Sequence, residues 1–208
     1  MHYQETIEVK SNLRLVMRER GKIVAKREGH NIFLNTGREW LAQLIAYGSF
    51  FPLTTIRDDR VRYMGVGVGG NRQLQLATMS PAVVTAYPGT NIQTDTNPNV
   101  TQLERPVRIS GGSLPYPGAV GDAWLGQVGA PPVFSGVPPT NVTFVRLFTS
   151  TEISYAPFLS VPLSEIGLFT SAASPLNVPF GTPIAYDTFD SLSKTTAFAL
   201  EVDWTISF

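Results

Sequence analysis

The glycine-rich run from residue 65 to residue 70 is the first place where this sequence could support chemistry. Its spacing satisfies the G-x-G-x-x-G pattern, which lets a pyrophosphate approach backbone amides. A dinucleotide site also needs a crossover helix and an acidic residue at the end of a later strand. Residues 71–78 make a poor crossover helix, and Asp95 stands in a Thr-Asn-Pro stretch. We therefore expect a tight turn or close backbone packing here, and no cofactor.

The histidines limit acid–base and nucleophilic chemistry. The chain has no cysteine, so thiolate nucleophiles and thiolate metal ligands are excluded. His2 lies at a terminus, which leaves His30 for any Ser-His-Asp triad, and the run Gly29-His30-Asn31 is typical of a turn. We expect no catalytic residue and no enzymatic turnover.

Two carboxylate pairs have spacings that glycosidases or calcium sites could use. Glu201 and Asp203 fall on one face of an expected strand, while Asp187 and Asp190 flank Phe189. Solvent-facing acids on an antiparallel strand have the same spacing, and no D-x-D-x-D-G calcium loop occurs. We therefore expect no metal site.

Four aromatic side chains stand in a stretch rich in proline and glycine. Such rings can stack on sugars or bases, but their commoner use is as anchors in protein interfaces. The candidate interface residues are Tyr87, Tyr116, Trp124 and Phe134.

The charges are unevenly distributed, although the formal net charge is zero. Of the 16 Lys and Arg residues, 12 precede Ala77, together with 7 acidic residues. The acids are interleaved with the bases, which weakens the field that a nucleic-acid backbone would follow. We expect contacts between the basic and acidic ends of neighbouring subunits, and no nucleic-acid or small-molecule partner.

The composition is typical of β proteins that bury surface in assemblies. Charged residues make up 15% of the chain, while it contains 18 Gly and 16 Pro. The first ten residues lack the basic start and apolar core of a signal peptide. No apolar run approaches the roughly 20 residues of a membrane-spanning helix, so we expect no membrane association.

The amino-terminal part predicts a hairpin and then one helix. Residues 12–19 and 22–28 alternate apolar and polar side chains on either side of Arg20-Gly21, as residues 6–10 also do. Thr36 and Glu39 then have the capping-box spacing, with Thr36 as the N-cap. Apolar residues follow at helical spacing at Trp40, Leu41, Leu44 and Ile45. These signals predict a helix over residues 37–47.

The middle of the chain has a weaker pattern. Residues 61–68 predict a strand, and residues 71–78 fit either a strand or a short helix. Residues 80–139 are rich in Pro, Gly, Thr, Asn and Ser, and Pro106 restricts the island at 103–109 to an edge strand. We expect this segment to extend outward and to contact other subunits.

The carboxyl-terminal part predicts four strands, over residues 142–148, 163–169, 184–189 and 196–208. The last run alternates most strictly, so one face should lie in the core. That face comprises Phe198, Leu200, Val202, Trp204, Ile206 and Phe208.

These elements predict a mainly β fold, in which an antiparallel β-sandwich-like body carries one short helix and long Pro/Gly-rich loops. Residues 1–79 and 140–208 would together form the body. Residues 80–139 would form the extended interaction segment.

Three blocks, in order, resemble virion and tail-associated proteins of tailed bacteriophages. The first joins NTGREWLA (35–42) to VRYMGVG (61–67), and the second is SEIGLF (164–169). The third combines YDTF (186–189) and Lys194-Thr195 with the closing DWTISF (203–208). The 80–139 segment is longer than this pattern leads one to expect.

The resemblance implies a non-enzymatic structural subunit located in the virion. It would assemble with itself and with other virion proteins at the neck, collar or tail. A capsid cement or decoration protein stays open, as does a carbohydrate- or receptor-binding module of the tail.

Overall fold

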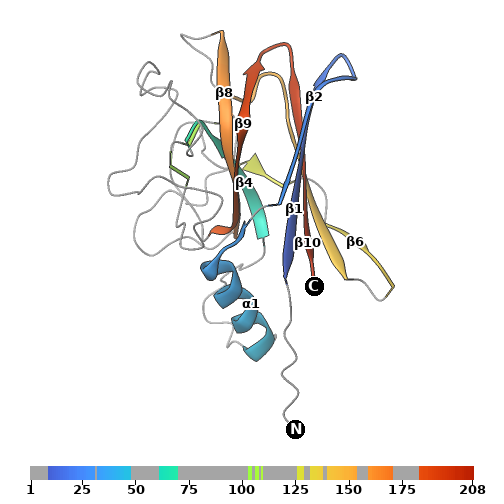
Figure 1. Ribbon diagram of the computed structural model, residues 1–208, viewed down its shortest axis with the longest axis vertical. Coiled ribbons are helices and arrows are strands. Elements are labelled where there is room, and N and C mark those ends of the chain that lie inside the picture. Colours follow the sequence, from blue (N-terminus) through green and yellow to red (C-terminus); the bar gives the residue numbers. More distant parts are fainter. Residues whose placement is uncertain are drawn as a thin grey trace.

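In the part of the chain that the structure describes, the protein is a sandwich of two five-stranded antiparallel sheets with one helix. The computed structural model describes residues 9–30, 32–47, 61–69, 103–104, 106–107, 109, 126–128, 132–137, 140–153, 159–170 and 183–208. Figure 1 shows the two sheets standing side by side, with α1 at the lower end of the body. The expected fold class is confirmed.

Sheet A contains the first and the last strands of the chain. Its strand order is β2-β1-β10-β7-β6. The strands are β2 (Lys22–His30), β1 (Lys10–Glu19), β10 (Ala199–Ser207), β7 (Asn141–Phe148) and β6 (Val133–Ser135). The carboxyl-terminal strand β10 therefore lies at the centre of the sheet.

Sheet B is built around a hairpin of two long strands, β8 and β9. Its strand order is β3-β9-β8-β4-β5. The strands are β3 (Ile32–Phe33), β9 (Pro183–Thr195), β8 (Ser160–Thr170), β4 (Val61–Gly67) and β5 (Gly126–Gln127). The strands expected at residues 61–68, 142–148, 163–169, 184–189 and 196–208 are present as β4, β7, β8, β9 and β10, and β9 is longer than expected, whereas the expected edge strand at 103–109 is represented only by isolated β-bridges.

The amino-terminal hairpin forms as the sequence predicts. Arg20 and Gly21 both have positive φ, at 48° and 82°, which is the conformation of the two-residue turns that match strand twist. The pattern at residues 29–31 was misread, because Gly29 and His30 continue β2 and pair with β1. Residues 1–8 and 31 lie outside the described residues.

The expected helix is present as α1 (Asn35–Tyr47), but the expected N-cap is wrong. The Arg38 amide donates to the Leu34 carbonyl over 2.9 Å, so the helical hydrogen bonds begin at Leu34. Thr36 lies in the first turn, and its hydroxyl donates a 2.5 Å hydrogen bond to the Pro183 carbonyl at the start of β9. A long-range tertiary contact thus replaces the local cap.

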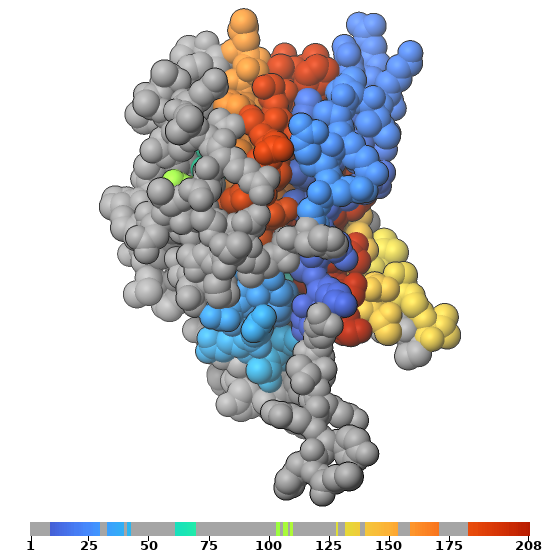
Figure 2. All heavy atoms as spheres, in the orientation of Figure 1, coloured from blue at the N-terminus to red at the C-terminus, as the bar shows by residue number. Residues whose placement is uncertain are grey.

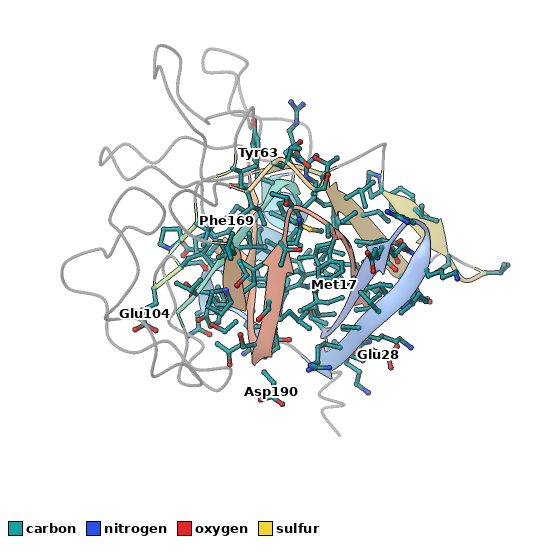
Figure 3. The ribbon with its side chains drawn as sticks, turned by 90° about the horizontal axis from the view of Figure 1, so that it is seen from above. Met17, Glu28, Tyr63, Glu104, Phe169 and Asp190 are labelled. Carbon is teal, nitrogen blue, oxygen red and sulfur yellow. The ribbon has the colours of Figure 1, made fainter. Side chains whose placement is uncertain are left out.

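The core lies between the two sheets, where Figure 3 shows Met17 inside and Glu28 and Asp190 at the periphery. On β10, Leu200, Val202, Trp204 and Ile206 are buried, as their alternation predicts. Phe198 is only partly buried against the core, and Phe208 is 50% exposed. The Trp204 indole donates to the Ser11 hydroxyl over 2.8 Å, so its polar atom is satisfied inside the body.

Part of the 80–139 segment packs into the body, whereas Val133, Phe134 and Val137 of the same segment are exposed. Leu103, Val107 and Ile109 are fully buried, and the Val107 amide donates to the Val66 carbonyl over 2.9 Å. Pro106 bridges Gly67 in an isolated β-bridge. Short apolar islands between prolines can therefore fill core positions without forming a strand. Residues 71–78 lie outside the described part of the chain, so the ambiguous assignment there stays a prediction.

Candidate protein–protein interface

The described residues of the glycine run, 65–69, are buried inside the protein. The Gly69 amide donates to Glu165 over 3.1 Å, and the Ser164 hydroxyl donates to the Gly69 carbonyl over 2.7 Å. Gly69 is buried, as are the preceding residues 64–68. The Gly69 amide, which a bound phosphate would need as a donor, thus already donates to the Glu165 carboxylate on β8.

Glu165 is a buried carboxylate that accepts hydrogen bonds from several parts of the chain, and the sequence pattern did not single it out. Its side chain is fully buried, and it also accepts hydrogen bonds from the Glu104 amide at 2.9 Å and from the Tyr186 hydroxyl at 3.0 Å. Burial, followed by the nearby Glu165 carboxylate, raises the pKa of Tyr186, so its hydroxyl remains a donor. The available signal was an acidic residue inside an apolar strand.

Of the four carboxylates considered for chemistry, Glu201 and Asp203 are engaged in ion pairs. On the outer face of sheet A, Arg14 lies 2.8 Å from Asp203, and Arg18 lies 2.7 Å from Glu201. On β9, Asp187 is buried and Asp190 is exposed, so the structure does not bring these two together as a pair. Across the described residues, no group of three or more His, Asp or Glu could hold a metal ion.

The outer face of sheet A has a shallow hollow of about 490 Å³. Its lining residues are Asn12, Leu13, Arg14, Glu28, Gly29, Thr143, Asp203 and Thr205. The hydroxyls of Thr143 and Thr205 lie 2.8 Å apart, and Arg14 is paired with Asp203. Among the described residues, those that line the hollow are aliphatic, polar or charged, and none is aromatic.

Only one of the four candidate interface aromatics can be placed. Tyr87, Tyr116 and Trp124 lie outside the described residues. Phe134 lies on the edge strand β6 and is 67% exposed. It is a large aromatic side chain in water, which is the behaviour expected of an interface residue.

Phe134 is part of a group of exposed apolar residues that we name the β6–β7 margin. It comprises Val133, Phe134 and Val137 of β6 and its turn, and Val145 and Leu147 of β7. Val133 pairs with Thr143, so its side chain shares the outward face with Val145 and Leu147, whereas Phe134 pairs with Val142 and points to the other face of the sheet. Figure 2 shows the yellow β6 region standing out from the side of the molecule.

The margin differs from the opposite edge of the same sheet in its charge. No charged residue occurs between Asp122 and Arg146. The other edge strand, β2, carries Lys22, Lys26, Arg27 and Glu28, all exposed. Charged side chains normally protect a sheet edge from other chains, and the margin has none.

Comparison with known proteins gives no relative: no family model, no curated protein and no solved structure matches the chain. The described helix is too short to cross a lipid bilayer.

Proposed function

We propose that the chain is a non-enzymatic structural subunit of a tailed-phage particle, located at the neck, collar or tail. It assembles with copies of itself and with neighbouring virion proteins. The observation that carries this proposal is the β6–β7 margin, where Val133, Val145 and Leu147 are exposed on the outward face of sheet A and Phe134 is exposed on the other face of the edge strand. A patch of this kind marks a surface that another protein covers.

The three phage-like sequence blocks support the same proposal, because most of their residues lie in neighbouring elements of the fold. The first block supplies α1 and β4, the second supplies β8, and the third supplies β9 and the end of β10. Strands β4, β8 and β9 are neighbours in sheet B, and α1 contacts β9. Glu165 of the second block accepts a hydrogen bond from Tyr186 of the third. The parts of the blocks in α1, β4, β8 and β9 are therefore neighbours, whereas the closing DWTISF lies mainly in β10 of sheet A.

The test is to look for the chain in purified tailed-phage particles encoded by the same genome. Mass spectrometry should detect it in a fixed ratio to the major tail and capsid proteins, and a cryo-EM map should place it at the neck, collar or tail. Density on the capsid shell would instead favour the cement or decoration role. Absence of the chain from intact particles would overturn the proposal.

A further inference from the structure

The outer face of sheet B, which points away from sheet A, is covered by other parts of the chain. Residues 163–170 of β8 and 183–189 of β9 are buried without interruption, although sheet A can cover only the alternate side chains that face it. In contrast, β10 of sheet A alternates between buried and partly exposed residues. Figure 3 shows Glu104 on the side of sheet B opposite to Met17. Sheet B therefore lies between two layers of side chains.

The side chains on this outer face form a group separate from the main core. Ile166 belongs to the core between the sheets, whereas Phe169 and Tyr186 are buried but do not belong to it. A Cβ atom at Gly167 would lie 2.7 Å from the Phe169 ring and 3.3 Å from Leu103 Cδ2. Leu103 therefore packs on the outer face of sheet B, and we name Leu103 and Glu104 the cover.

One carboxylate attaches the cover to the sheet. The Glu104 amide and the Tyr186 hydroxyl donate to Glu165 Oε2 over 2.9 and 3.0 Å, and the Gly69 amide donates to Oε1 over 3.1 Å. The fit is close, because a Cβ atom at Gly69 would lie 2.5 Å from Glu165 Oε1 and 2.6 Å from the Glu104 Cβ. Removal of this acceptor would leave buried donors without it, which is costly.

The chain next to the cover is held by contacts of a different kind. Pro106 forms a β-bridge with Gly67, and the Val107 amide donates to the Val66 carbonyl over 2.9 Å. The Val107 side chain belongs to the main core. Residues 106–107 are thus anchored to β4 and the core, and the cover could move away from Glu165 while this anchor and both sheets stay intact.

We infer that Glu165 is a latch, which holds Gly69 and the cover over sheet B and opens locally while the sandwich stays folded. A segment that lies outside the main core and is attached through one side chain opens at a lower free energy than the central strands do. Opening exposes the outer-face side chains of Phe169 and Tyr186. The inference goes beyond the proposed function and does not depend on it, because it concerns a motion within one chain.

Native-state hydrogen exchange of the full chain, followed by NMR, tests whether the latch opens separately. Exchange of the Gly69 and Glu104 amides should change little in low urea, because local opening exposes little surface. Exchange of the β10 amides should be slower and should accelerate with urea, because it requires global unfolding. The same urea dependence at both sets of amides would overturn the inference.

Glu165→Gln tests the carboxylate itself. The change keeps the shape of the side chain and replaces one acceptor oxygen by a donor NH₂ group, so at least one of the buried donors loses its acceptor. Exchange at Gly69 and Glu104 should become faster by at least about tenfold, whereas exchange at Val107 and in β10 should stay as in the wild type. Unchanged exchange at Gly69 and Glu104, equal acceleration in β10, or a variant that does not fold would each contradict a local latch.

A second variant and a matched control separate the latch from a general loss of stability. Gly69→Ala leaves the carboxylate in place, but its new Cβ atom would overlap Glu165 and Glu104, so exchange at Glu104 should again become faster. Glu201→Gln is the control, because it removes a carboxylate from the partly exposed ion pair with Arg18 on sheet A. It should leave exchange at Gly69 and Glu104 unchanged. An equal effect of Glu201→Gln, or none of Gly69→Ala, would count against the latch.

Discussion

Trp204 is the side chain on which the interior of sheet A most depends. It is fully buried on the central strand, and its indole donates to Ser11. Trp204→Ala should lower the free energy of unfolding by about 3 to 5 kcal/mol, because it leaves a large cavity and an unpaired hydroxyl. Urea unfolding measures the loss. Phe208→Ala is the control, since Phe208 is half exposed just beyond the end of β10 and its loss should cost clearly less; equal costs would contradict this assignment.

The protonation of Lys194 should change the free energy of unfolding of the protein. Its ammonium is buried and donates to the carbonyls of Thr149 at 3.2 Å and Thr195 at 3.0 Å. Burial lowers the pKa of Lys194 from 10.5 to about 8, against the opposing effect of the Glu152 carboxylate.

The pH dependence follows from that pKa. Between the lowered value and the ordinary one, the unfolded chain binds more protons than the folded chain. The free energy of unfolding should therefore rise with pH across this window. Lys194→Met should remove this rise, as measured by urea unfolding from about pH 7 to about pH 10. The same pH slope in both chains would show that Lys194 is not the group responsible.

The sequence predicts single residues well where one strand determines their environment. The alternation of residues 198–206 was enough to place Leu200, Val202, Trp204 and Ile206 in the core. Glu165 was not predictable, because two of its donors are the amides of Gly69 and Glu104, 96 and 61 residues away. Periodicity carries no information on such distant partners.

At the level of secondary-structure elements, the position of the start of α1 is fixed by its packing against the start of β9. A Cβ atom at Gly37 would overlap the Ile184 carbonyl oxygen and lie 3.1 Å from its Cγ2. Gly37→Ala should therefore destabilise the protein, by about 1 to 3 kcal/mol, although alanine is the better helix former. Ala42→Gly, at an exposed position of α1, measures the ordinary propensity cost of up to about 1 kcal/mol. A gain in thermal stability for Gly37→Ala would mean that the helix does not pack against β9.

The error in the expected N-cap of α1 also has a physical reason. Thr36 and Glu39 match the local spacing of a capping box, and that spacing favours a helix start at residue 37. The Thr36 hydroxyl instead donates to Pro183, which is 147 residues away. The type and length of the helix followed from local signals, and only its first residues were decided by a tertiary contact.

For the whole molecule, the central place of β10 makes the carboxyl end essential. Residues 203–207 pair with β1 on one side and β7 on the other. A chain truncated after Val202 should therefore lose cooperative thermal unfolding, as monitored by circular dichroism. Removal of Phe208 alone should leave the transition intact, because Phe208 lies beyond the strand and is half exposed. A truncated chain that melts cooperatively would contradict the central role of β10.

The fold class could be predicted because the longer strands have recognisable patterns of their own, whereas the short strands β3, β5 and β6 do not. The order of strands within the sheets could not be predicted, since pairing partners are far apart in the chain. Nor could the positions of Leu103, Val107 and Ile109, whose burial depends on β4 rather than on their own proline-rich surroundings. Phe134 was selected from the sequence, and its interface role stays a prediction, whereas the rest of the margin depends on the pairing of β6 with β7.

The pairing of β1 with β10 also has a consequence for how the protein is made. Arg14 and Asp203, which face each other in this pair, are 189 residues apart in the chain. Sheet A therefore cannot close around β1 before β10 has been synthesised. Contacts of such long sequence separation fold slowly. Until then the edge of β1 that pairs with β10 has no partner strand there, and unpaired strand edges favour aggregation.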